Sequence, residues 1–154
     1  MKKSKVKNPI VRRVNDRFET IQKVAEVFVT GNSAQKGLLV SGDAGTGKSW
    51  WIKQAFVKTD TTTRVDYCKS RSFTAPAFYA KLWENRNPGD VVVFDDCSLS
   101  SMGGENFRKL TDFLKGALEL TSGPRMLGYE AASQNQLFRE LGVEREFDFQ
   151  GSII

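Results

Sequence analysis

Histidine is absent from this 154-residue chain, and cysteine occurs only twice, at Cys68 and Cys97. Without histidine, neither a Cys/His zinc site nor a Ser/His or Cys/His nucleophile can be assembled. We expect both cysteines to be buried free thiols, because structural disulfides are rare in a reducing compartment. The absence of histidine therefore excludes enzymes that use a Cys/His zinc site or a nucleophile activated by histidine.

Long apolar runs are also missing. No stretch of about 18 apolar residues occurs, and the basic N-terminus lacks the apolar segment of a secretory signal. We therefore expect a soluble, cytoplasmic protein with no membrane partner. The length and the 40% hydrophobic content predict a single globular domain.

The net charge of +5 comes from one end of the chain. Residues 1–17 hold seven cations and one anion, and the remainder is close to neutral. This basic segment could screen phosphates on DNA or RNA, or it could be a solvated end without a partner. We expect residues 1–8 to form a disordered basic arm and residues 9–154 to form the ordered core.

Helical and extended patterns alternate along the chain. We expect a helix between Asp16 and Thr30 with Asp16 as its cap, and another helix marked by Trp51. The remaining predictions are strands at 37–41, 64–69 and 91–94, helices at 75–84 (capped by Ser72 or Thr74) and 105–120, and then a strand at 125–129, a short helix at 133–141 and the start of a strand within 147–154. This order predicts an α/β fold, a three-layer sandwich with a mainly parallel sheet.

The segment between the first predicted strand and the next helix carries a phosphate-binding motif, G-x-x-x-x-G-K-[ST]. Its glycines let the backbone N–H groups approach an anion, and the helix that follows adds the positive end of its dipole. We expect Lys48 to reach the β- and γ-phosphates of ATP and the Ser49 hydroxyl to bind Mg²⁺. The residues predicted to contact the nucleotide are Gly42, Asp43, Ala44, Gly45, Thr46, Gly47, Lys48, Ser49 and Trp50.

Two acids follow the most hydrophobic predicted strand, 91–94. We expect Asp95 to contact Mg²⁺ through water, because Mg²⁺ retains much of its hydration shell. Asp96 is placed to orient or deprotonate the attacking water, so we expect it to be catalytic together with Lys48. Asp96 could instead be a capping or turn residue, since an aspartate is one methylene shorter than the glutamate more often used.

Trp50 and Trp51 directly follow the motif. We expect Trp51 to pack in the core. Trp50 is close enough in sequence to border the nucleotide, and a purely structural role is the alternative.

With both motifs in place, the chain resembles the AAA+ and related additional-strand P-loop ATPases, particularly small phage-encoded members. The resemblance covers 37–96 well and the rest loosely, and further matching segments are Thr74-Ala-Pro-Ala-Phe-Tyr79 before Trp83, Asp95-Asp-Cys97 and Phe147 through Gly151-Ser-Ile-Ile154. It implies ATP hydrolysis that remodels or moves a nucleic acid or protein partner. It also implies a homo-oligomer in full-length form, the host cytoplasm for a phage-encoded member, and an adenine pocket built partly from residues 9–14.

The resemblance further implies a sheet order of 5-1-4-3-2. In that order, the strand after Asp95 lies between the strand ending at Asp95 and the strand preceding the loop. Gly151-Ser-Ile-Ile154 looks like the start of this strand, so we expect a C-terminally truncated ATPase without its sensor, fifth strand and lid. Arg125, Arg139 and Arg145 are candidates, by location, for an arginine that reaches a neighbouring subunit, or they are surface residues.

Two other functions fit part of this pattern. A small-molecule kinase of the nucleotide kinase type would use the same loop, but it needs an acceptor site and an arginine-rich lid. A non-hydrolysing nucleotide-binding module would need the loop without a role for Asp96.

Overall fold

A computed structural model describes residues 9–30, 36–57, 64–69, 74–95, 104–119, 125–130 and 136–154. The predictions for the arm 1–8, for Cys97 and for Asp96 lie outside these described residues. The elements are α1 Pro9–Val29, α2 Lys48–Val57, β1 Val65–Lys69, α3 Ala75–Glu84, β2 Val91–Asp95, α4 Gly104–Leu118, β3 Met126–Gly128, α5 Gln136–Leu141, β4 Glu146–Asp148 and β5 Ser152–Ile153.

The main sheet is parallel, in the order β1-β2-β5. On the other side of β5, Gly37 forms a parallel bridge with Ile153, and the Leu38 N–H donates to the Ile153 carbonyl at 2.9 Å. The C-terminal strand therefore lies between β2 and the segment that leads into the glycine-rich loop. This confirms the position predicted for the Gly151–Ile154 segment.

The predicted strand at 37–41 is wrong in its extent. Only Gly37 forms a bridge, and the Leu39 side chain is 90% exposed. β5 consists of Ser152–Ile153. Its backbone can therefore pair with the segment near Gly37 but offers no partner to the residues closer to Ser41. The rest of the segment, up to Ser41, has no assigned strand.

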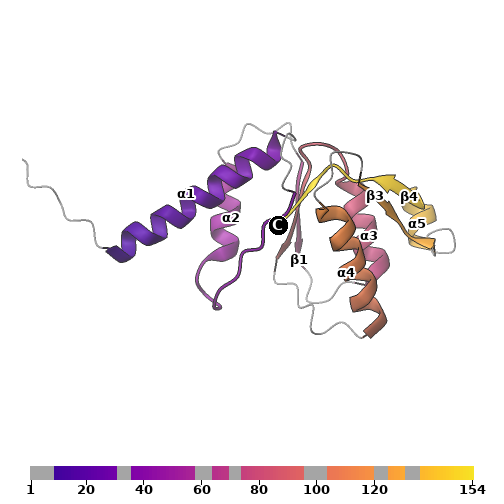
Figure 1. The fold of residues 1–154 in the computed structure, drawn as a ribbon, viewed down its shortest axis with the longest axis horizontal. Coiled ribbons are helices and arrows are strands. Elements are labelled where there is room, and N and C mark those ends of the chain that lie inside the picture. Colours follow the sequence, from indigo (N-terminus) through magenta and orange to yellow (C-terminus); the bar gives the residue numbers. More distant parts are fainter. Residues whose placement is uncertain are drawn as a thin grey trace, which may run out of the picture.

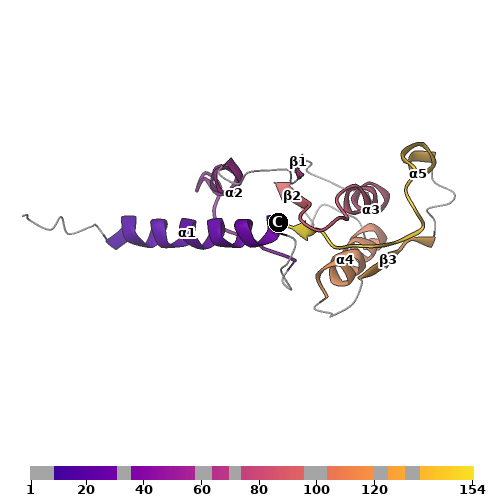
Figure 2. The same ribbon diagram turned by 90° about the horizontal axis from the view of Figure 1, so that it is seen from above.

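Helices cover both faces of this sheet (Figure 1 and Figure 2). Side chains alternate along β2, so Val91 and Val93 pack in a cluster with α1 and α2. Val92 packs on the opposite face, in the cluster that contains the buried residues of α3 and α4. The chain is thus an α/β protein whose two hydrophobic clusters lie on opposite sides of one small parallel sheet.

The first helix begins earlier than the sequence suggested. α1 starts at Pro9, a residue suited to a first helical turn, so Asp16 lies inside the helix and does not cap it. The Asp16 carbonyl accepts a hydrogen bond from the Thr20 hydroxyl at 2.9 Å. Ala25 and Phe28, near the other end of α1, are buried against α2 and the sheet.

α3 matches its predicted bounds, and its cap is Thr74, whose hydroxyl accepts from the Ala77 N–H. Thr74 was one of the two predicted caps. The helix presents a fully buried Tyr79 to the second sheet. The Tyr79 hydroxyl lies 3.1 Å from the Leu127 carbonyl oxygen and 2.7 Å from that of Arg145, which fastens α3 to this sheet.

The second sheet is an antiparallel pair, β3 with β4. We expected one strand to start within 147–154, but the segment divides: β4 pairs with β3, and β5 joins the parallel sheet. Gly151 lies between the two strands, and a Cβ there would collide with the carbonyl oxygen of Asn85. The backbone at Gly151 thus packs closely against Asn85 at the point where the two strands divide. The sequence pattern alone did not indicate this division.

Cys68 is buried, as predicted. Among the helices that the structure describes, none combines the length and the apolar character needed to cross a membrane.

Candidate nucleotide-binding site

The glycine-rich loop joins Ser41 to the first residue of α2. Gly45 and Gly47 have φ values of 77° and 81°, in the left-handed region that favours glycine. At Gly47 a Cβ would also lie 3.2 Å from the Trp51 Nε1 atom. Thr46 donates its hydroxyl to the Asp43 carbonyl at 2.8 Å and closes the turn. Gly45 and Gly47 are therefore required by the backbone path.

Lys48 lies at the N-terminus of α2 and points back to the loop. Its ammonium donates to the carbonyls of Gly42 and Asp43, at 2.8 Å each. These bonds keep the positive charge beside the backbone that the sequence assigned to phosphate binding. Because the N-terminal end of a helix carries partial positive charge, the same point favours an anion.

Ser49 and Asp95 meet although they are 46 residues apart. The Ser49 hydroxyl donates to Asp95 Oδ1 at 2.5 Å, and the Asp95 side chain is only 10% exposed. Ser49 comes from the first turn of α2, and Asp95 is the last residue of β2. The structure thus brings together the two residues predicted to serve the metal.

The oxygen donors of Ser49 and Asp95 suit Mg²⁺, which prefers hard oxygen ligands and keeps several waters. The described residues contain no group of three or more His, Cys, Asp and Glu side chains that could hold a metal without other ligands. A site with one hydroxyl and one carboxylate fits a metal whose other ligands are phosphate oxygens and water.

Lys69 is a site residue that the sequence reasoning missed. It is the last residue of β1 and is paired in register with Asp95 of β2. Its ammonium lies 3.9 Å from Asp95 Oδ2. The signal was present, because two parallel strands that end together place their last side chains at the same edge of the sheet.

The two tryptophans after the motif differ in exposure. Trp51, which we expected in the core, is only half-buried and belongs to neither hydrophobic cluster; its ring packs instead on that of Phe18 on α1, with centroids 4.4 Å apart. Trp50 is 58% exposed and meets Trp51 edge to face, with ring centroids 5.4 Å apart. Its contact with a nucleotide remains a prediction.

Arg125 is neither a surface residue nor free to reach another subunit. It is buried, and its guanidinium donates to the Ala117 carbonyl at 2.6 Å and to the Gly151 carbonyl at 3.5 Å. Burial lowers its pKa, and Asp148 opposes that effect. Arg125 therefore ties the end of α4 to the start of β5, whereas Arg139 and Arg145 are exposed.

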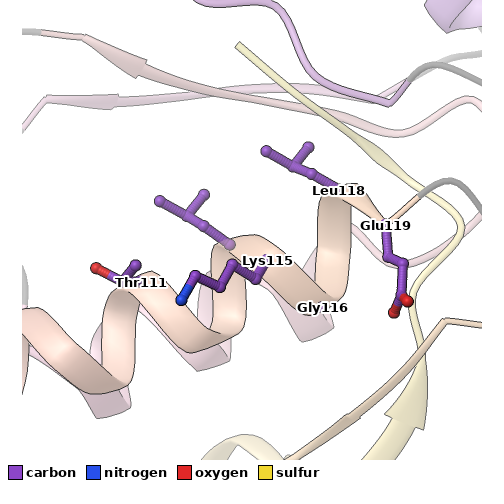
Figure 3. A pocket seen from close by; sticks show the side chains of 6 residues that line it. Thr111, Lys115, Gly116, Leu118 and Glu119 are labelled. Carbon is purple, nitrogen blue, oxygen red and sulfur yellow. The ribbon is translucent and has the colours of Figure 1, made fainter.

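A separate hollow lies along α4, beside the last turns of the helix (Figure 3). It is open and has a volume of about 590 Å³. Its lining residues are Thr111, Leu114, Lys115, Gly116, Leu118 and Glu119, and none of them belongs to the predicted nucleotide site.

Sequence comparisons place the chain beside a phage protein. It is 29% identical over 143 residues to an "Uncharacterized 36.7 kDa protein in nrdC-mobD intergenic region" of Enterobacteria phage T4. The match covers 92% of this chain and 41% of that protein, so the chain spans less than half the length of this relative. No solved structure matches the chain at a significant level. The family described as "Protein of unknown function (DUF815)" matches residues 3–150, and the chain belongs to that family.

Proposed function

We propose that the chain binds Mg-ATP on residues 42–49 and hydrolyses it, as an AAA+-like P-loop ATPase. The observation that carries the proposal is the 2.5 Å contact between the Ser49 hydroxyl and Asp95 Oδ1. Two motifs, recognised separately in the sequence, meet at this contact beside a loop whose shape requires glycine. A glycine-rich turn without a ligand would not need a buried acid from another strand.

Each residue has a distinct role in this proposal. The loop's N–H groups and the N-terminus of α2 receive the phosphates. Lys48 exchanges the carbonyls of Gly42 and Asp43 for phosphate oxygens, which is a small movement because its ammonium already lies at the loop. Ser49 and Asp95 would hold Mg²⁺, Asp95 through water, and the bound metal would neutralise phosphate charge. Asp96 orients the attacking water, and this role remains a prediction outside the described residues.

The strand order supports the same proposal. From one edge of the sheet to the other, the order is β1, β2, β5 and then the segment at Gly37. This is the order that the resemblance to additional-strand ATPases implies, with the loop and Asp95 at the same end of their strands. We therefore propose the P-loop sandwich as the fold, and a homo-oligomer that remodels or moves a nucleic acid or protein partner as the full-length protein.

Calorimetry with ATP, with and without Mg²⁺, tests the binding step. We expect wild type to bind and Lys48→Ala to lose binding by a factor of about 30 or more, because a charge-assisted contact contributes roughly 2 kcal/mol or more. Lys115→Ala, at an exposed position on α4, is the matched control and should bind as wild type does. No heat with wild type in the presence of Mg²⁺ would refute the proposal.

Phosphate release, measured with and without DNA, tests the hydrolysis step. We expect turnover by wild type and binding without appreciable turnover by Asp96→Asn. Equal turnover in Asp96→Asn would remove the role assigned to that residue. Binding without release in wild type would identify a non-hydrolysing module, and phosphorylation of an added nucleoside monophosphate would identify a kinase.

A further inference from the structure

The carboxylate of Asp95 is held at both of its oxygens. Oδ1 accepts from the Ser49 hydroxyl at 2.5 Å, and the Lys69 ammonium lies 3.9 Å from Oδ2. The Asp95 side chain is 10% exposed, so much of its hydration is lost. A carboxylate in such a place requires hydrogen bonds and a nearby positive charge.

Lys69 differs from Asp95 in its own exposure. Its side chain is 64% exposed, although its backbone is fixed in register opposite Asp95. An ion pair with one exposed partner contributes little to stability, because water screens it and the long side chain loses freedom. The same exposure lets the ammonium move into water when a stronger cation arrives.

We propose that Lys69 is the resident counter-ion of Asp95 and that it competes with a divalent metal for this carboxylate. The inference rests on the proposed function, which assigns Asp95 to the metal. Lys69 is a positioning residue, because it acts through Asp95 and does not touch the reacting atoms. Because Lys69 competes for the carboxylate, the nucleotide-free site holds a metal weakly.

The reason is electrostatic. A divalent cation beside Asp95 is repelled by the ammonium that already neutralises this carboxylate. A triphosphate brings several negative charges of its own, which outweigh one ammonium. The metal is therefore taken up together with the nucleotide, and the empty site does not fill with metal in advance.

The test measures metal binding without nucleotide. Mn²⁺ is titrated into the full chain and free Mn²⁺ is followed by its electron paramagnetic resonance signal. We expect Lys69→Met to bind Mn²⁺ about three- to tenfold more tightly than wild type, because one exposed positive charge is lost next to a divalent ion. Lys69→Arg should bind as wild type does, and Lys115→Met controls for the general loss of a positive charge.

A double variant locates the gained affinity. Lys69→Met combined with Asp95→Asn should lose the gain, since the carboxylate that attracts the metal is gone. Unchanged Mn²⁺ affinity in Lys69→Met, or an equal gain in Lys115→Met, would overturn the inference. The titration needs no nucleotide, so this result is independent of the calorimetry with ATP, whose failure would remove the proposed function instead. Circular dichroism confirms that each exposed-lysine variant is folded.

Discussion

The middle of α3, around Tyr79, and the start of α2, around Lys48, differ in how their side chains are surrounded. Around Tyr79, the aromatic side chains Phe113, Tyr129, Phe138 and Phe147 surround one ring, with centroids 5.1 to 5.7 Å from it. Around Lys48, the loop is exposed and is held by a few hydrogen bonds to its own carbonyls. The first region has the packing expected of a stable core, and we propose that the second binds the ligand, so mutations should separate the two.

The largest expected effect is on stability, from Tyr79→Ala. Removing a fully buried aromatic ring leaves a cavity between α3 and the second sheet and should cost about 3–5 kcal/mol of unfolding free energy. Urea unfolding followed by circular dichroism measures this loss. A loss below about 1 kcal/mol would show that the aromatic cluster is not the stable part of the molecule.

Ser49→Ala should act on the other region. The variant lacks the hydroxyl assigned to Mg²⁺, so we expect Mg-ATP to bind roughly tenfold more weakly, with a loss of only about 1 kcal/mol of unfolding free energy from the hydrogen bond to Asp95. Ser49→Thr keeps a hydroxyl and should bind as wild type does. A large drop in stability with Ser49→Ala would mean that the contact with Asp95 serves folding and not the metal.

Tyr79→Phe separates the hydroxyl from the ring. Burial raises the pKa of the Tyr79 phenol, and the charges of Glu146 and Glu144 add to this, so the group remains a neutral donor. Its loss leaves buried carbonyls with fewer donors, and we expect a cost of about 1–2 kcal/mol. Nucleotide affinity should not change. A changed affinity would couple the two regions.

The smallest effect should come from Asp66 on β1. Burial alone would raise its pKa, but hydrogen bonds from Lys81 and Asn85 and nearby positive charge outweigh this, and the pKa is lowered. A lowered folded-state pKa gives stability that is present above the unfolded value and is lost as pH falls through the folded value. We expect Asp66→Asn to remove up to about 1 kcal/mol at neutral pH and to flatten the acid side of the stability profile below about pH 4. An unchanged acid limb in Asp66→Asn would show that other carboxylates produce it.

Local patterns were sufficient for most elements. The bounds of α3, the strand ending at Asp95 and the loop between two elements all follow from signals within a few residues, and the cap of α3 was narrowed to Ser72 or Thr74. The contact between Ser49 and Asp95 was also predictable, because the carboxyl ends of parallel strands lie at the same edge of a sheet. The carboxyl group of Asp95 and the ammonium of Lys69 could have been paired by the same reasoning.

Other features depend on contacts between distant residues. The burial of Arg125 requires carbonyls from Ala117 and Gly151, and no spacing in the sequence indicates them. The division of 146–153 into β4 and β5 depends on the packing of Gly151 against Asn85. The short ladder at Gly37 depends on where β5 provides a partner.

The sequence by itself determined the chemistry of this protein: a loop that only glycines can form, with a lysine and a hydroxyl at the helix start and an acid after a buried strand. These features are local, because each is specified by backbone conformation or residue type. The tertiary structure decided which groups share a space, such as Arg125 with two carbonyls and Gly151 with the carbonyl of Asn85. Proximity across a fold is set by packing and register, which no single segment contains.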